Sequence, residues 1–101
     1  MNEYELLFIV QPNADEARLE AINARTAEFI TGNGGEVLST RNWGHRRLSF
    51  PIRKQTSGTY ILSRLRLTAH AVEELQRLLR LNEDVLRFLV VRAEEVPAPA
   101  Q

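Results

Sequence analysis

The sequence predicts an α+β fold, a ferredoxin-like βαββαβ sandwich in which two helices cover one face of a four-stranded antiparallel sheet. β-Prone stretches and stretches with apolar residues at helical spacing follow one another in this order along the chain. The most economical way for two helices to cover four strands is to pack on the same sheet face. A chain of 101 residues holds one core, so we expect a single domain over residues 1–93 and a short flexible C-terminal tail over 94–101.

Each element follows from its spacing and its end signals. In order, we expect a strand at 3–10, a helix from the N-cap Asn13 to Gly32, a strand at 36–52, a strand at 59–67, a helix from the N-cap Thr68 to Asn82, and a strand at 85–92. Ser57 and Gly58 favour a turn, so that the second and third strands form a hairpin. Pro51 cannot donate a ladder hydrogen bond and favours an edge position for its strand. The first and third strands are then central, and the second and fourth are edges.

One sheet face has no helix over it in such a sandwich. If Leu6, Phe8 and Val10 point toward the helices, Leu7 and Ile9 point away from them. The same alternation turns a further set of side chains on the third and fourth strands away from the helices: Tyr60, Leu62, Arg64, Arg66, Arg87, Leu89 and Val91. A partly apolar surface of this kind favours a partner. Alternatively, the C-terminal tail or a second copy of the chain covers this sheet face.

Cations are concentrated in one part of a chain whose formal net charge is zero. Between residues 37 and 72 there is no acid, and this block holds Arg41, Arg46, Arg47, Arg53, Lys54, Arg64 and Arg66. Guanidinium groups suit bidentate contacts with phosphate and stacking on bases, so we expect a local basic field that favours a polyanion. The alternatives are a GC-rich genome, which accounts for arginine in place of lysine but not for the missing acids, and protection of an edge strand against aggregation.

Within the stretch NWGHRRLSFPIRK, residues 42–54, alternation turns Leu48, Phe50 and Ile52 to one face. We expect these three side chains in the core. Arg46 and Lys54 stand at the ends of the same row and must extend past the sheet edge into solvent or onto a partner.

The sequence holds no convincing catalytic or metal-binding group. It has no cysteine, and His45 and His70 are isolated, so we expect no metal, no cofactor and no enzymatic activity. The glycine-rich stretch 32–35 follows a helix, whereas a phosphate-binding loop precedes one, so it is interpreted as a helix C-cap and turn. The N-terminal apolar run is too short for a signal peptide or a membrane span. We therefore expect a cytoplasmic protein with no membrane partner and no small-molecule substrate.

The chain resembles the bacterial small-subunit ribosomal protein six family over almost its whole length. The resemblance is most specific in four stretches that match in order and spacing: 43–48 (WGHRRL), 50–54 (FPIRK), 58–60 (GTY) and 81–91 (LNEDVLRFLVV). It implies a ferredoxin-like fold and a place in the small ribosomal subunit, bound to central-domain ribosomal RNA together with small-subunit ribosomal protein eighteen. Many relatives begin with a basic residue after Met1, where this chain has Asn2 and Glu3.

The resemblance, taken with the basic block and the open sheet face, implies two sets of contact residues. The RNA-side candidates are Arg46, Arg47, Arg53, Lys54 and Arg87. The protein-side candidates are Trp43, Tyr60, Leu62, Leu89 and Val91.

Two hypotheses from different classes remain open. The leading one is a non-catalytic structural RNA-binding protein of the ribosome. The alternative is a homodimeric ferredoxin-like ligand-binding or regulatory module that associates through its open sheet face. A small hydrolase ranks last, because residues 11–14 (QPNA) offer no glycine or arginine for an anion-binding loop before the first helix. A few arginine contacts support only about micromolar, salt-sensitive RNA binding, so we expect RNA shape or a co-binding protein to supply specificity.

Overall fold

The computed structural model describes residues 1–93, which form four strands and two helices in the predicted order. These elements are β1 (Asn2–Val10), α1 (Glu16–Gly32), β2 (Glu36–Ile52), β3 (Gln55–Leu67), α2 (Ala69–Leu81) and β4 (Val85–Arg92). The predicted tail, residues 94–101, lies outside the described residues. Neither described helix is long and apolar enough to cross a membrane.

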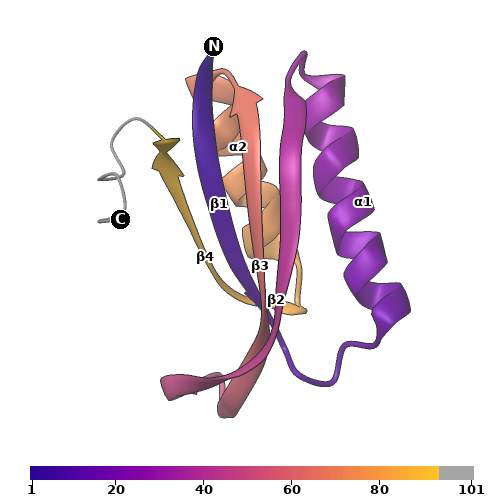
Figure 1. The fold of residues 1–101 in the computed structure, drawn as a ribbon, viewed down its shortest axis with the longest axis vertical. Coiled ribbons are helices and arrows are strands. Elements are labelled where there is room, and N and C mark those ends of the chain that lie inside the picture. The colour runs from indigo at the N-terminus through magenta and orange to yellow at the C-terminus, as the bar shows by residue number, and fades with distance from the viewer. Residues whose placement is uncertain (94–101) are drawn as a thin grey trace.

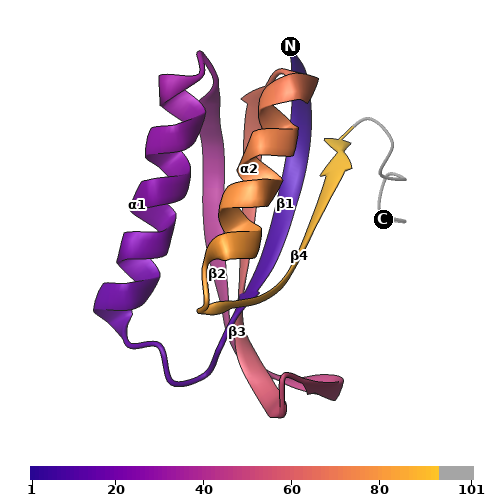
Figure 2. The ribbon, with the colours of Figure 1, turned by 180° about the vertical axis from the view of Figure 1, so that it is seen from behind.

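The four strands form one antiparallel sheet in the order β2-β3-β1-β4. As predicted, β1 and β3 are central, and β2 and β4 are edges. Both helices lie behind the sheet in Figure 1 and in front of it in Figure 2, so they cover the same face. The predicted ferredoxin-like sandwich is confirmed, and no helix within residues 1–93 covers its second sheet face.

The main hydrophobic core lies between the helices and the sheet. On β1 the side chains of Leu6, Phe8 and Val10 are 0% exposed, which confirms that they point toward the helices. Each fully buried side chain of this size contributes about 1.5–3 kcal/mol to folding. They belong to one core cluster with apolar side chains of α1, β3 and α2, among them Ile22, Ile30, Ile61, Leu65, Leu67, Val72, Leu75 and Leu79.

Side-chain caps fix the N-termini of both helices. Thr68 caps α2 as predicted, because its side chain accepts a hydrogen bond from a backbone N–H of the first turn. The predicted cap of α1 was wrong: Asp15 holds that position and accepts from the Arg18 N–H at 2.9 Å. Asn13 belongs to the preceding turn, where its N–H donates to Gln11 Oε1 at 2.8 Å. A carboxylate at this position both caps the helix and suits the positive end of its dipole.

The β2–β3 hairpin turns earlier than expected. Arg53 and Lys54 form a two-residue turn, with φ angles of 49° and 68°, and Ile52 pairs with Gln55. Positive φ at both central residues is the type I′ geometry that matches the twist of the paired strands. The sequence prediction missed this turn because residues other than glycine and asparagine rarely adopt that conformation.

Gly58, which was expected in the turn, lies inside β3 instead. A Cβ atom at this position would stand 2.5 Å from Ile9 Cγ2 and 2.9 Å from the Val10 carbonyl oxygen. Glycine is required here by the close approach of β1, and it has no role in reversing the chain.

Of the three β2 side chains expected in the core, Leu48 is buried, but none of the three belongs to the main core between the helices and the sheet. Leu48 is 8% exposed, but it packs with Ile9 in a small second cluster on the sheet face that points away from the helices, and Ile52 packs against that cluster. Phe50 is 57% exposed. The end of the hairpin extends beyond the helices (Figure 1), so no helix is available to bury this row. The ladder is also irregular around Pro51, between Arg47 and Ile52, as expected for an edge strand.

Candidate nucleic-acid and partner interfaces

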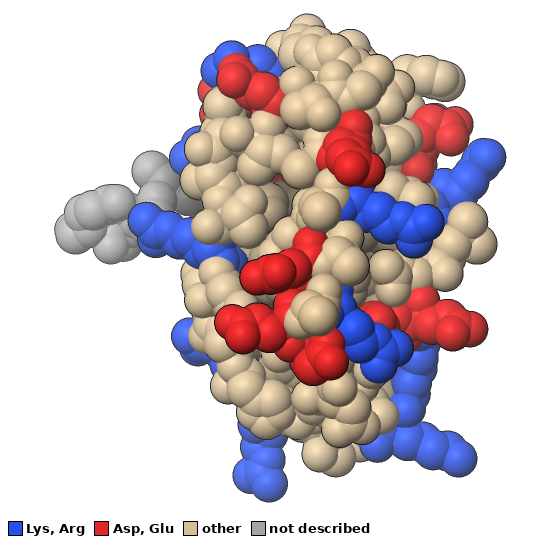
Figure 3. Space-filling model, turned by 90° about the vertical axis from the view of Figure 1, so that its right-hand side faces the viewer, with Lys and Arg blue, Asp and Glu red and all other residues tan. Residues whose placement is uncertain are grey.

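Four of the predicted RNA-side residues lie on the distal part of the β2–β3 hairpin, which extends past the helices (Figure 1). Arg46 and Arg47 pair with residues of β3, and Arg53 and Lys54 form the turn. All four side chains are exposed, and within residues 1–93 none of them forms an ion pair. Viewed from the side of α1, Lys and Arg side chains project at the end of the molecule where the hairpin lies, whereas acids and bases are mixed over the middle (Figure 3).

The basic block is not one continuous field, because its C-terminal arginines are neutralised. Arg64 Nε lies 3.3 Å from Glu3 Oε1. Arg66 lies 3.4 Å from Glu3 Oε2 and 2.8 Å from Glu36 Oε1. The strand register explains this, since Arg66 is the partner of Glu3 on one side and of Glu36 on the other. The sequence analysis predicted one basic field over residues 37–72, because Glu3 and Glu36 lie outside this block in the sequence.

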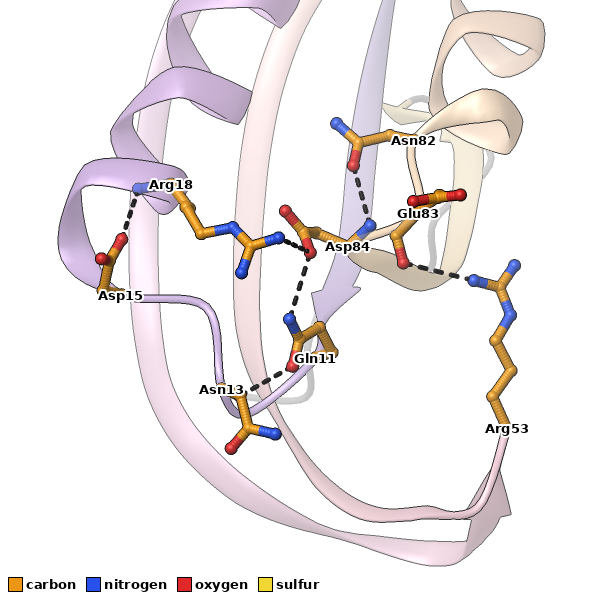
Figure 4. A network of polar contacts seen from close by, with 8 residues as sticks. All are labelled: Gln11, Asn13, Asp15, Arg18, Arg53, Asn82, Glu83 and Asp84. Atoms are coloured by element: carbon orange, nitrogen blue, oxygen red, sulfur yellow. Dashed lines mark hydrogen bonds and ion pairs between the residues drawn. The ribbon is translucent and has the colours of Figure 1, made fainter.

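A network of hydrogen bonds connects the loop between α2 and β4 with the β1–α1 loop, α1 and the hairpin turn (Figure 4). The Asp84 carboxylate accepts hydrogen bonds from Gln11 Nε2 at 3.1 Å and from Arg18 Nη2 at 3.0 Å. In the same loop the Glu83 carbonyl accepts from Arg53 Nη1 at 3.4 Å. This loop therefore contacts the β1–α1 loop, α1 and the hairpin turn. Arg53 thus has a contact within the protein in addition to its predicted contact with RNA.

The sheet face without helices carries an apolar strip. The register aligns Leu62 of β3, Leu7 of β1 and Leu89 of β4 in one row, and Tyr60 stands beside Ile9 in the next row. Leu89 is 57% exposed, so the strip is accessible. The residues that line a groove on this face are Leu7, Ile9, Tyr60, Arg87, Phe88 and Leu89, although the side chain of Phe88 packs against the main core. Three predicted protein-side residues are thus brought together, and Leu7 joins them.

The other two predicted protein-side residues lie outside this strip, and neither they nor Leu62 line the groove. Val91 is half-buried and stands opposite Glu5, in the row that also contains Arg64. Trp43 lies on the outer edge strand β2 and is 44% exposed.

Arg87 lies on a different strand from the other RNA-side candidates. It is exposed on β4 and stands opposite Ile9, at the sheet edge farthest from β2. Arg87 is thus on a different edge strand from Arg46, and it borders the apolar groove.

Trp43 occupies a β-bulge in the edge strand. The register passes from Asn42 opposite Ile61 to Gly44 opposite Tyr60, which leaves Trp43 as the extra residue. Gly44 has a φ of 86°, and its N–H donates to Asn42 Oδ1 at 2.7 Å. A bulge of this kind redirects the side chain of its extra residue.

Arg46 lies against Trp43. Its guanidinium carbon is 5.7 Å from the centroid of the Trp43 ring, and its Nε donates to the Trp43 carbonyl at 3.3 Å. Five to six ångströms is the range in which a guanidinium and an aromatic ring attract each other. The sequence prediction included both residues but did not identify this pairing.

The two histidines are exposed and stand apart, His45 on β2 and His70 in the first turn of α2. Within residues 1–93 there is no group of three or more His, Cys, Asp or Glu side chains that could hold a metal ion.

Comparisons with known proteins agree with this architecture. Residues 3–92 match the family described as Ribosomal protein S6. The crystal structure of 30S ribosomal protein S6 from Thermotoga maritima superposes with a TM-score of 0.85, at 24% sequence identity, over 92% of this chain and 88% of that chain. The structural likeness supports the fold, and the family match extends over all six elements. This chain therefore belongs to the ribosomal protein S6 family of small-subunit ribosomal proteins.

Proposed function

We propose that this chain is a non-catalytic component of the small ribosomal subunit that binds central-domain ribosomal RNA together with small-subunit ribosomal protein eighteen. In this proposal the distal β2–β3 hairpin contacts RNA, and the sheet face without helices contacts the partner protein. One observation carries the proposal: the same sheet presents two kinds of surface. It has exposed cations that form no ion pair within residues 1–93, and it has an exposed apolar strip. Membership of a ribosomal protein family supports it.

Arg46, Arg47 and Lys54 supply the main RNA contacts. Their side chains are exposed on a hairpin that projects from the domain, so an RNA backbone can approach them without contacting the helices (Figure 1). Each charge-assisted hydrogen bond contributes about 1.5–3 kcal/mol before the costs of ordering. Three or four such contacts support binding that weakens as salt rises and that does not depend on sequence.

The apolar strip supplies the protein contact. Leu7, Leu62, Leu89 and Tyr60 lie in adjacent rows of three neighbouring strands, and a compact apolar centre with a polar rim is typical of protein interfaces. Arg87 and the ion pair of Arg64 with Glu3 form part of such a rim. Burial of this strip by the partner protein would add affinity and specificity that the hairpin alone lacks.

The RNA side is tested by charge reversal. Binding of the full chain to a central-domain RNA fragment is measured by filter binding and footprinting, with and without the partner protein. The double variant Arg46→Glu and Arg47→Glu is expected to weaken binding at least about tenfold, because repulsion replaces two phosphate contacts. The matched control is Arg25→Glu with Arg77→Glu, which makes the same change of net charge on the two exposed helix surfaces and is expected to bind within about twofold of wild type. Equal losses in both variants would contradict the hairpin assignment.

The protein side is tested at Leu89. Leu89→Asp places a charge at the β4 end of the strip, so it is expected to abolish the gain in RNA affinity that the partner protein provides and to leave binding by the lone chain unchanged. Leu81→Asp is the matched control, because Leu81 is 75% exposed at the end of α2 on the opposite side of the domain. If Leu89→Asp preserved the gain, the open face would not be the partner surface.

The alternative, a homodimeric regulatory module, uses the same strip in a different way. It predicts that light scattering detects a dimer and that the stability of this dimer depends on Leu89. It also predicts that RNA does not compete with dimerisation. A monomer across the concentration range, together with RNA binding that requires the hairpin, would exclude it.

A further inference from the structure

We propose that Trp43 and Arg46 form a stacking site for one unpaired RNA base, with the adjacent cations contacting the flanking phosphates. This inference rests on the RNA binding proposed above and names the part of the RNA that the hairpin recognises. It also moves Trp43 from the protein side of the interface to the RNA side.

The local backbone presents the indole outward. Trp43 is the extra residue of the β-bulge between Asn42 and Gly44. The left-handed conformation of Gly44 and its 2.7 Å hydrogen bond to Asn42 Oδ1 fix the bulge. The indole remains 44% exposed on the edge strand, so a large apolar ring is accessible at the edge of the sheet.

Arg46 gives the ring a fixed neighbour. Its Nε donates to the Trp43 carbonyl at 3.3 Å while its guanidinium carbon stays 5.7 Å from the ring centroid. The hydrogen bond anchors Nε and leaves the terminal nitrogens to donate to phosphate. An aromatic ring with an arginine beside it is the combination that stacks unpaired bases in many RNA-binding sites.

The charge around the pair favours a nucleic acid over an apolar protein surface. Arg41 and Arg47 flank the pair along β2, and both are exposed. Glu36 of β2 and Glu3 of β1 are paired with Arg66 at the far end of β2, and Glu5 of β1 lines a pocket with Arg41. Trp43 is also absent from the lining of the apolar groove that serves as the proposed protein surface. An isolated aromatic ring among cations suits one base better than a hydrophobic interface.

The chain offers a direct probe, because Trp43 is its one tryptophan. Indole emission of the full chain is measured at low salt during titration with a single-stranded oligoadenylate of about 8 nucleotides and with a fully paired RNA duplex of the same length. Stacking predicts strong quenching by the single strand and little change with the duplex, although both bind through phosphates.

Three variants separate stacking from apolar contact. Trp43→Phe keeps an aromatic ring and is expected to bind the single strand within about threefold of wild type. Trp43→Leu and Trp43→Ala remove the ring and are expected to bind it about tenfold more weakly, with duplex binding within twofold. Thermal unfolding is recorded for each variant, and the wild-type quenching experiment does not depend on how any variant folds.

Each contrary outcome has a distinct meaning. Equal quenching by both RNAs, or wild-type affinity of Trp43→Leu, overturns the stacking site while leaving salt-sensitive binding through Arg46 and Arg47 intact. The emission of Trp43 is also measured with a tryptophan-free form of small-subunit ribosomal protein eighteen. If this protein changes the emission and neither RNA does, the stacking site is overturned and Trp43 belongs to the protein side. Failure of the wild-type chain to bind these RNAs or a central-domain fragment overturns both this inference and the proposed function.

Discussion

At the scale of single residues, Gly58 determines how closely β1 and β3 can approach. A Cβ atom there would stand 2.5 Å from Ile9 Cγ2 and 2.9 Å from the Val10 carbonyl oxygen. The Ile9 side chain could move away, but the Val10 carbonyl is part of the backbone of a central strand and cannot move without disturbing the sheet. We therefore expect Gly58→Ala to lower the free energy of unfolding by about 1–3 kcal/mol, the usual cost of overpacking, as measured by urea denaturation.

The matched control is Gly32→Ala at the end of α1. No atom outside the local backbone of the helix lies within 4 Å of a Cβ built at this position, so the variant should be as stable as wild type or more stable by up to about 1 kcal/mol through helix propensity. If Gly58→Ala and Gly32→Ala unfolded at the same urea concentration, close packing would not be the reason for glycine at position 58.

At the scale of elements, Asp84 connects the loop between α2 and β4 with α1 and the β1–α1 loop. Its side chain is 17% exposed and accepts hydrogen bonds from Gln11 at 3.1 Å and from Arg18 at 3.0 Å. The Arg18 side chain is 55% exposed, so solvent screens the ion pair and it contributes little by itself. We expect Asp84→Ala to lower the free energy of unfolding by about 1–2 kcal/mol, and Arg18→Ala to lower it by less than about 1 kcal/mol.

A double-mutant cycle of Asp84→Ala and Arg18→Ala isolates the interaction between these two side chains. Glu74→Ala serves as a control, since its contact with Arg77 is 4.0 Å long and exposed; its effect should stay within about 0.5 kcal/mol. A loss at Asp84 no greater than that at Glu74 would mean that the network of Figure 4 does not stabilise the loop.

The order of the elements and the faces of the central strands could be predicted from sequence because both depend on local spacing. The period-two alternation of a strand places Leu6, Phe8 and Val10 on one face, as observed, whichever strands lie beside them. Features that depend on tertiary position could not be predicted in this way. Phe50 continues the alternation of Leu48, but it is exposed because the hairpin extends beyond the helices. The partners of Asp84 are 66 and 73 residues away, so no local pattern indicates them.

At the scale of the whole molecule, the fold divides a block of cations that is continuous in sequence. Antiparallel pairing brings Glu3 and Glu36 to Arg64 and Arg66 at one end of the sheet. The hairpin cations at the other end have no carboxylate partner within residues 1–93. A net charge of zero is therefore compatible with one basic end, which would orient the protein as it approaches RNA.

This division predicts a difference in the salt dependence of RNA binding. Each phosphate contact adds about 0.7–0.9 to the slope of log affinity against log salt. Arg46→Gln with Arg47→Gln should therefore reduce the magnitude of the slope by about 1.5. Arg64→Gln with Arg66→Gln removes the same charge, but these guanidiniums already pair with carboxylates, so the slope should change by less than about 0.5. Filter binding of a central-domain RNA fragment at several salt concentrations measures both. Equal changes in the two variants would show that the block acts as one field despite its ion pairs.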